Sequence, residues 1–305
     1  MSGAVASGLI AVTGASGFIG RYLCADLEAA GYRVRRLGRG PAEQAEDRQT
    51  DYSRDSLVAA LDGADAVIHL AGRRMTREDA PMDLAPFWEP NVAVIGDLVH
   101  AARENGLQKI VLASTIAVYA PASGLPYRES APTRPINAYA LSKLMAEQHL
   151  EMLTRARGPA AVALRLAAVY GHGEKGTPAL MKFIGQASAG ETIVLTGNAD
   201  YRIDQLYVRD ATAAFLAALR GTATGVFNIG GGRAIPVGEI AETVNVVFGN
   251  AGNIRYDTDS DAPMPQTAMA LDEAERMLGW APGFSLRAGL EDFERMQRQA
   301  GGRAE

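Results

Sequence analysis

A tyrosine and a lysine in the middle of the chain have the types and spacing of an acid–base pair. Tyr139 and Lys143 are four residues apart, so they share one face of a helix. A tyrosine with an ordinary pKa of about 10 is a poor base at neutral pH, but a nearby ammonium favours the phenolate and lowers that pKa. The pair could then move the proton of a substrate hydroxyl or carbonyl while a nicotinamide exchanges hydride, and Lys143 could hold the nicotinamide ribose. Ser114 and Thr115, after a predicted strand, could place a hydroxyl on the reacting oxygen.

A glycine-rich segment near the N-terminus predicts where the cofactor binds. Residues 13–20 read Thr-Gly-Ala-Ser-Gly-Phe-Ile-Gly, after a strand pattern and at the start of a helix pattern. Such a turn directs backbone N–H groups and the positive end of the helix dipole at a diphosphate. The spacing is G-x-x-G-x-x-G, and the strand-turn-helix context supports a dinucleotide site. The predicted contacts are Gly14, Ser16, Gly17, Phe18, Ile19 and Gly20.

The end of the second predicted strand bears on the choice between NAD and NADP. An acidic residue there would bind the ribose 2′-hydroxyl of NAD, but the sequence has Gly38 followed by Arg39. An arginine suits a 2′-phosphate, so NADP is somewhat favoured over NAD. Asp51 and Tyr52 are expected to flank the adenine. Leu70, Ala71 and Gly72 are expected at the carboxyl edge of the third strand, where ligands bind in such sheets.

Strand and helix patterns alternate through the first half of the chain. Strands are predicted at residues 9–13, 34–37, 66–70, 110–113 and 161–166, and helices at 21–30, 56–61, 91–105 and 139–153. This alternation predicts an α/β fold with a doubly wound parallel sheet.

The later part of the chain predicts a smaller lobe. Helices are expected near residues 179–189, 237–248 and 272–278, and a frayed tail at 297–305. We expect a dinucleotide-binding Rossmann domain over residues 1–166. We expect a mainly substrate-binding lobe over 167–305, with elements around 204–230 returning to the first domain.

Composition narrows the class of protein. The chain has 305 residues and a formal net charge of −5, which gives no reason to expect nucleic acid or an anionic membrane as partner. Cys24 is the single cysteine, which fits the reducing cytoplasm, and the N-terminus lacks the basic start of a signal peptide. Four scattered histidines predict no metal site. We expect a cytoplasmic protein that binds a small molecule.

A series of motifs then comes in a fixed order. They are residues 13–20, His69-Leu-Ala-Gly72, Ser114–Tyr119, Tyr139-x-x-x-Lys143, Leu164–Gly171, Tyr207–Asp210, Val226–Gly230 and Leu278–Trp280. Together they resemble the extended short-chain dehydrogenase/reductases, the NAD-dependent epimerase/dehydratase family, over nearly the whole chain. The resemblance implies an enzyme in which Thr115 is the catalytic hydroxyl, Tyr139 the acid/base and Lys143 its partner. It also places Asn91 at the cofactor site, and suggests a homodimer and a nucleotide-sugar substrate.

The sequence departs from the family pattern at two places. Where family dehydratases carry an Asp-Glu pair after the catalytic threonine, this chain has Ile116-Ala117, which argues against dehydration. Positions that clamp a sugar nucleotide's diphosphate hold Ala168, Ile203 and Ser260. Residues that could compensate are Arg202 and Arg209, which we expect at the substrate, and also Arg233 and Lys182.

Three functions remain open from the sequence. The first is a nucleotide-sugar epimerase that works through a transient 4-keto intermediate. The second is an NADPH-dependent reductase of a keto-sugar or another small carbonyl compound, favoured by Arg39 and the missing clamps. The third is a non-catalytic NADP-binding regulator, which the intact Thr115/Tyr139/Lys143 set argues against.

Overall fold

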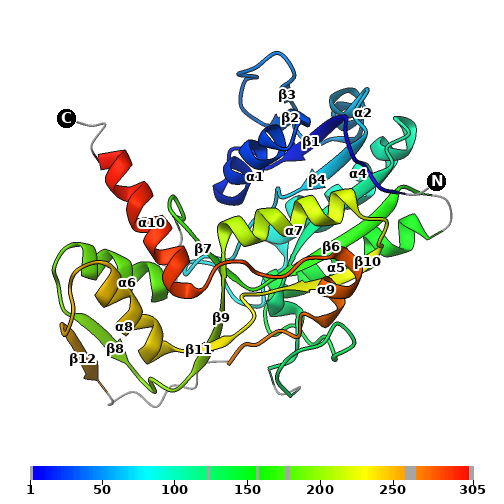
Figure 1. Cartoon of the computed structure of the whole chain (residues 1–305). Coiled ribbons are helices and arrows are strands. Elements are labelled where there is room, and N and C mark those ends of the chain that lie inside the picture. The colour runs from blue at the N-terminus through cyan, green and yellow to red at the C-terminus, as the bar shows by residue number, and fades with distance from the viewer. Residues whose placement is uncertain (1–2, 122–123, 156–157, 176–178, 258–265, 302–305) are drawn as a thin grey trace.

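A parallel sheet of seven strands organises the computed structural model of the chain, which describes residues 3–121, 124–155, 158–175, 179–257 and 266–301 (Figure 1). The strand order is β10-β6-β5-β4-β1-β2-β3. The strands are β1 (Leu9–Thr13), β2 (Arg33–Gly38), β3 (Arg48–Gln49), β4 (Ala66–His69), β5 (Lys109–Thr115), β6 (Ala160–Leu166) and β10 (Gly225–Ile229). Every residue of β1 and β4 is buried, as expected for strands covered on both faces. The predicted doubly wound parallel fold is confirmed.

Helices cover both faces of this sheet. On one face α1 (Phe18–Ala29) and α7 (Val208–Arg220) pack into a core shared with β1, β4 and β6. On the other face lie α2 (Arg54–Leu61), α4 (Val94–Glu104) and α5 (Ala138–Thr154), as Figure 1 shows. The strand order reverses beside β1, between β2 and β4, and the loops that follow these strands meet at their carboxyl ends. A ligand site is expected at this reversal.

Two predicted elements differ in their bounds from the structure. The helix expected over residues 91–105 is divided: a short α3 (Ala85–Phe87) and a π-helix (Trp88–Ala93) come first, and α4 begins at Val94. Pro90 lies inside the π-helix and lacks the N–H that a regular helix would use there. Strand β5 extends to Thr115, so Ser114 and Thr115 end the strand instead of following it. A 3₁₀ turn (Ile116–Val118) comes next.

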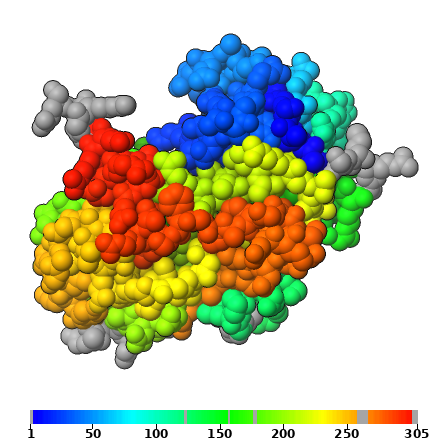
Figure 2. All heavy atoms as spheres, viewed as in Figure 1, coloured from blue at the N-terminus to red at the C-terminus, as the bar shows by residue number. Residues whose placement is uncertain are grey.

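The later elements form a smaller lobe. Its strands pair as β11-β9-β7 and β12-β8, with bounds β7 (Ala168–Tyr170), β8 (Ile193–Thr196), β9 (Arg202–Tyr207), β11 (Ala234–Pro236) and β12 (Ile254–Asp257). Its helices are α6 (Ala179–Ser188), α8 (Val237–Val247) and α10 (Leu286–Gly301), while α9 (Asp272–Leu278) packs near β10 of the main sheet. Figure 2 shows α10 in red against the gold segments of this lobe.

The end of the chain corrects one expectation. Residues 297–301 were expected to fray, but they complete α10, whose Leu290 and Phe293 are buried against the smaller lobe. Residues 302–305 of the expected tail lie outside the described residues. Within the described ranges, none of the helices combines the length and apolar character that a membrane crossing requires.

Candidate active site

The glycine turn between β1 and α1 has the close approaches that a dinucleotide site needs. Gly14 has a φ of +68°, and a Cβ atom there would lie 2.8 Å from the backbone nitrogen of Ala71. A Cβ on Gly20 would overlap the carbonyl oxygen of Gly14, so this glycine lets α1 pack against the turn. Gly17 begins α1, whose first N–H groups have no partner within the helix. The turn therefore fits a diphosphate at the helix N-terminus.

A cavity of about 960 Å³ opens at this turn and runs along the carboxyl ends of β1, β2 and β4. Ten residues that the sequence singled out line it: Gly14, Ser16, Gly17, Gly38, Arg39, Asp51, Tyr52, Leu70, Ala71 and Gly72. Its size and glycine-lined wall fit a nicotinamide dinucleotide. Phe18, Ile19 and Gly20 do not line it. Phe18 and Ile19 pack with the smaller lobe's hydrophobic core, and Gly20 packs beneath the turn.

At the far end of this cavity, Arg39 and Tyr52 lie together. The exposed guanidinium of Arg39 lies 5.8 Å from the centre of the Tyr52 ring, whose residue has a φ of +69°. Hydrogen bonds from the side chain and backbone of Ser53 lower the pKa of Asp51. This end therefore presents one cation and one firmly ionised carboxylate to a ligand.

Another residue that lines the cavity, His69 at the end of β4, is a buried neutral group. Its Nδ1 atom lies 2.9 Å from the hydroxyl of Thr13, which also accepts a hydrogen bond from the backbone nitrogen of Ala71. Burial, with the charge of Lys143, lowers the pKa of His69 to about 3. Thr13 and His69 thus join the ends of β1 and β4 without adding a charge to the cavity floor.

The side chain of Asn91 connects the loop after β4 to helix α5 through hydrogen bonds. Its side chain is buried, accepts a hydrogen bond from Arg73 N at 2.8 Å and donates to Arg73 O at 3.0 Å. It also donates to the hydroxyl of Ser142 at 2.8 Å. The structure places Asn91 beside Gly72 and Arg73 rather than among the cavity residues. Its expected contact with the cofactor stays a prediction, while its fixing of the cavity wall is seen directly.

The three predicted catalytic side chains come from two neighbouring elements. Thr115 ends β5, and Tyr139 lies in the first turn of α5, which begins where Asn137 accepts a hydrogen bond from Ala140 N at 2.8 Å. The Thr115 hydroxyl accepts a hydrogen bond from Ala117 N at 3.2 Å and lies near enough to the Tyr139 hydroxyl to lower its pKa, and Lys143 is buried one turn further along α5. The Tyr139 ring packs 6.1 Å from the ring of Phe87.

Burial shifts the pKa values of both Tyr139 and Lys143. Burial raises the pKa of Tyr139 in the free protein, against the hydrogen bond from Thr115 and the charge of Arg74, which both lower it. Arg74 is thus a cation that the sequence did not place near Tyr139, while the lowering expected from Lys143 stays a prediction. Burial lowers the pKa of Lys143 to about 8, and the charge of Glu147 raises it.

Arg74 and Glu174 were missed by the sequence reasoning. Arg74 follows Arg73, whose backbone is hydrogen-bonded to Asn91. The guanidinium of Arg74 donates to both carboxylate oxygens of Glu174, at 2.9 and 3.3 Å. The two residues are 100 positions apart, so no local pattern could have paired them. Ser114 also differs from expectation, because its hydroxyl is buried and donates to Glu147 instead of facing a substrate.

Each arginine that was expected to replace a missing diphosphate-binding residue already has a partner within the chain. Arg202 donates to Ala234 O at 3.3 Å, Arg209 pairs with Asp292 at 2.7 Å, and Arg233 pairs with Glu239. Ala168 and Ile203 lie in β7 and β9, as aligned, whereas Ser260 lies outside the described residues. Substrate binding by Arg202 and Arg209 stays a prediction. No cluster of metal-binding side chains is found in the described part of the chain.

Comparison with known proteins agrees with this geometry. The profile of the "NAD dependent epimerase/dehydratase family" matches residues 10–230. The chain belongs to this family. The UDP-glucose 4-epimerase of Azospirillum brasilense is 30% identical over 345 aligned positions, covering 98% of this chain and 95% of the relative. The resemblance inferred from the ordered motifs is thus confirmed.

Two solved structures of epimerases share this architecture. The UDP-N-acetylglucosamine 4-epimerase from Bacillus cereus superposes with a TM-score of 0.87 at 30% identity, covering 95% of this chain and 96% of its own. The UDP-glucuronic acid 4-epimerase from Bacillus cereus, in complex with UDP-glucuronic acid and NAD, has a TM-score of 0.82 at 26% identity, covering 96% and 99%.

Proposed function

We propose that this family member is a nucleotide-sugar epimerase in which Tyr139 moves the proton of the reacting sugar hydroxyl. The observation that carries the proposal is the meeting of Thr115, at the carboxyl end of β5, with Tyr139 and Lys143 on the helix α5 that packs on this strand, in a sheet whose carboxyl edge also holds a cavity that fits a nicotinamide dinucleotide. The relatives and structural neighbours, which are named as nucleotide-sugar epimerases, support the same reaction class.

The chain's own residues divide the work of this reaction. NAD supplies the acceptor and donor of hydride when it is bound. Tyr139, as phenolate, takes the proton of the sugar hydroxyl when the carbonyl forms, and returns it when the carbonyl is reduced from the other face. Thr115 hydrogen-bonds the reacting oxygen. Lys143, as ammonium, would hold the nicotinamide ribose and, as their helical spacing predicts, would favour the phenolate of Tyr139.

The turn after Thr115 offers no second acid–base pair. Ile116 packs against two hydrophobic clusters, and Ala117 has no proton to exchange. Elimination of water needs an additional acid and base at this place. Oxidation followed by re-reduction therefore suits the site better than dehydration.

A reductase of a keto-sugar or another small carbonyl compound is the second candidate, and Arg39 favours it. Gly38 stands at the end of β2 where an acid would bind the ribose of NAD, and the exposed Arg39 lines the cavity next to it. We propose on this basis that the site accepts the 2′-phosphate of NADP. Arg209 and Arg233 of the smaller lobe are paired with carboxylates, so fewer cationic side chains are available to bind the diphosphate of a nucleotide sugar.

One experiment separates the epimerase from the reductase. An epimerase returns the hydride to the same intermediate, so it forms product without consuming external cofactor, whereas a reductase consumes NADPH in stoichiometric amounts. The purified protein is incubated with a panel of UDP-, dTDP- and GDP-sugars while the absorbance of reduced cofactor is followed and products are separated. Product with no net redox change supports the epimerase. No measurable affinity for any nucleotide sugar retires it.

We also propose a cytoplasmic homodimer. The outer face of α5 carries Leu141, Met145 and Met152, of which Leu141 is 38% and Met152 62% exposed. Residues 141, 145 and 152 lie on one side of a helix, and a second copy would bury this apolar stripe. Light scattering of the wild type and of Met152→Glu tests the dimer: a monomeric wild type, or a variant dimer of equal strength, overturns it.

The cytoplasmic location is proposed because the buried free thiol of Cys24 suits a reducing compartment.

A further inference from the structure

A buried ionic group lies behind the catalytic residues, on the side away from the cofactor cavity. Glu147 is on α5, one turn beyond Lys143, and its side chain is only 3% exposed. It accepts a hydrogen bond from the hydroxyl of Ser114 on β5. It also pairs with Arg165 on β6, whose Nη2 lies 2.7 Å from Oε2 and whose Nε lies 3.1 Å from Oε1. One carboxylate therefore joins three elements of the active site.

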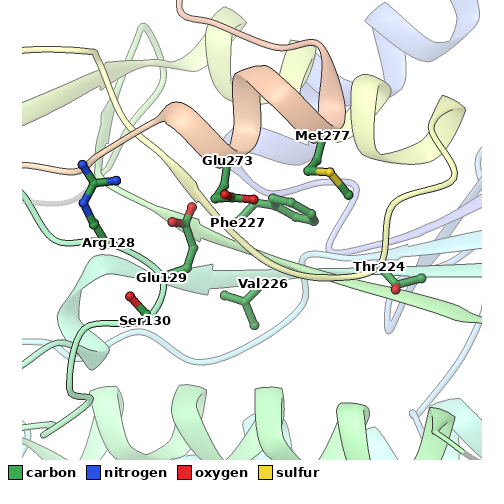
Figure 3. A pocket seen from close by; sticks show the side chains of 8 residues that line it. All are labelled: Arg128, Glu129, Ser130, Thr224, Val226, Phe227, Glu273 and Met277. Atoms are coloured by element: carbon green, nitrogen blue, oxygen red, sulfur yellow. The ribbon is translucent and has the colours of Figure 1, made fainter.

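The polar group continues from Arg165 to the surface. Arg165 Nη1 donates to the Tyr119 hydroxyl at 2.8 Å, and this hydroxyl donates to Asn228 Oδ1 at 2.7 Å. The backbone nitrogen of Asn228 donates to Glu129 Oε1 at 2.8 Å. Glu129 and Phe227 line the surface pocket of about 360 Å³ drawn in Figure 3. The side chains of this group, which are Ser114, Glu147, Arg165, Tyr119 and Asn228, thus each have a defined partner.

The placement of Glu147 connects it to both catalytic elements. Ser114 directly precedes Thr115 on β5 and donates its hydroxyl to Glu147, so this bond ties the strand end that carries Thr115 to the helix that carries Tyr139. On α5, Glu147 is four residues from Lys143 and eight from Tyr139. Burying an ion pair is costly, and hydrophobic residues of similar size often give equal stability. A positioning role explains why charged groups occupy this place.

We propose that Glu147 is a positioning residue for the Thr115/Tyr139/Lys143 group. By holding Ser114 and Arg165 it fixes the register between the end of β5 and the face of α5. Its carboxylate is the negative charge closest along α5 to Lys143 and raises the pKa of that lysine, and the neutral His69 on β4 is the other titratable group that interacts with Lys143. Removal of Glu147 therefore loosens the geometry and lets Lys143 lose its proton at lower pH.

The test compares Glu147→Gln with Glu151→Gln, a matched change one turn further along α5 at an exposed residue paired with Arg155. Two readouts are used: the pH dependence of NADH affinity, measured by fluorescence, and the pH profile of kcat. For Glu147→Gln we expect kcat to fall about 10- to 100-fold and the alkaline loss of NADH affinity to begin at lower pH than in the wild type. Glu151→Gln should match the wild type in both.

A second variant guards against a folding defect, because Glu147→Gln leaves Arg165 buried without its full counter-charge. Glu147→Met combined with Arg165→Met removes both charges and keeps an apolar core. A folded double variant with the same two changes in NADH affinity and kcat supports the proposal. If either folded variant keeps the wild-type pH dependence of NADH affinity, the proposal is overturned.

The inference rests on the proposed function only for the kcat readout. A wild type that converts no nucleotide sugar counts against the epimerase, and the NADH affinity profile then decides the role of Glu147 alone. The pH at which affinity declines reports the charge of Lys143, which a purely structural ion pair would leave unchanged.

Discussion

Arg74 and Glu174 form a two-point ion pair that joins the loop after β4 to the loop after β7, beside Tyr139. The two distances are 2.9 and 3.3 Å, and the Glu174 side chain is 1% exposed whereas that of Arg74 is 63% exposed. A buried carboxylate thus holds an exposed guanidinium in place. The charge of Arg74 acts on Tyr139 and lowers the pKa of its phenol.

The first prediction concerns this charge. Arg74→Gln should raise the pKa of Tyr139 further, so the acid limb of kcat/KM should move to higher pH. At the acid end we expect kcat/KM to fall by about 3- to 10-fold, with a smaller loss at alkaline pH. Arg77→Gln, an exposed arginine of the same loop, is the control. An equal loss at every pH would show that Arg74 binds substrate instead of acting on Tyr139.

The second prediction concerns the proton on Tyr139. Tyr139→Phe keeps the aromatic contact with Phe87 but removes the transferable proton. We expect kcat to fall by about 10²- to 10⁴-fold with NADH affinity nearly unchanged. Tyr256→Phe, at a tyrosine 48% exposed on β12, should be neutral. Wild-type turnover by the Tyr139 variant would remove this residue from the mechanism.

The third prediction concerns cofactor choice. Arg39→Asp removes the cation proposed for the 2′-phosphate and places an acid near the adenosine ribose, so preference should move from NADP towards NAD, by roughly tenfold or more. Titration of both cofactors against wild type and variant measures it. Arg48→Asp, an exposed arginine on β3, controls for the change of net charge. A wild type that already prefers NAD tenfold contradicts the interpretation of Gly38-Arg39.

The sequence was sufficient for features that depend on neighbouring residues. Gly14 and Gly20 are required by contacts within one strand-turn-helix unit, so their spacing predicted the turn. Tyr139 and Lys143 share a helix face whatever surrounds it. Continuous apolar strands predicted the parallel sheet because both of its faces are covered.

The features that the sequence did not predict depend on distant partners. Glu147 and Arg165 resemble solvent-exposed charges in sequence, and only the packing of α5 on β5 and β6 buries them together. Likewise, the effect of Lys143 on the pKa of Tyr139 was predicted from helical spacing alone. Spacing gives a shared face but not the burial that raises the pKa of Tyr139, nor Arg74 arriving from another loop.

The last prediction concerns Asp204, a buried carboxylate on β9 that fixes two passing segments. It accepts hydrogen bonds from Gly231 N at 2.6 Å and Met269 N at 3.1 Å. Burial raises the pKa of Asp204 from 3.8 to about 6, although these two bonds lower it. A raised pKa means that the folded state binds the proton more tightly than the unfolded chain. Its contribution to stability is therefore complete below about pH 4 and is lost as the pH rises through about 6.

The difference between 3.8 and about 6 corresponds to about 3 kcal/mol in the free energy of unfolding. Asp204→Asn cannot titrate and also replaces one accepting oxygen by a donor, so it carries a constant penalty and lacks this pH dependence. Urea unfolding between pH 4 and pH 7 should show the wild type losing about 2 kcal/mol of this difference relative to Asp204→Asn as the pH rises. Asp200→Asn, at an exposed acid four residues earlier, should run parallel to the wild type. Parallel curves for Asp204→Asn and wild type would mean that Asp204 stays ionised throughout, held by its two backbone donors.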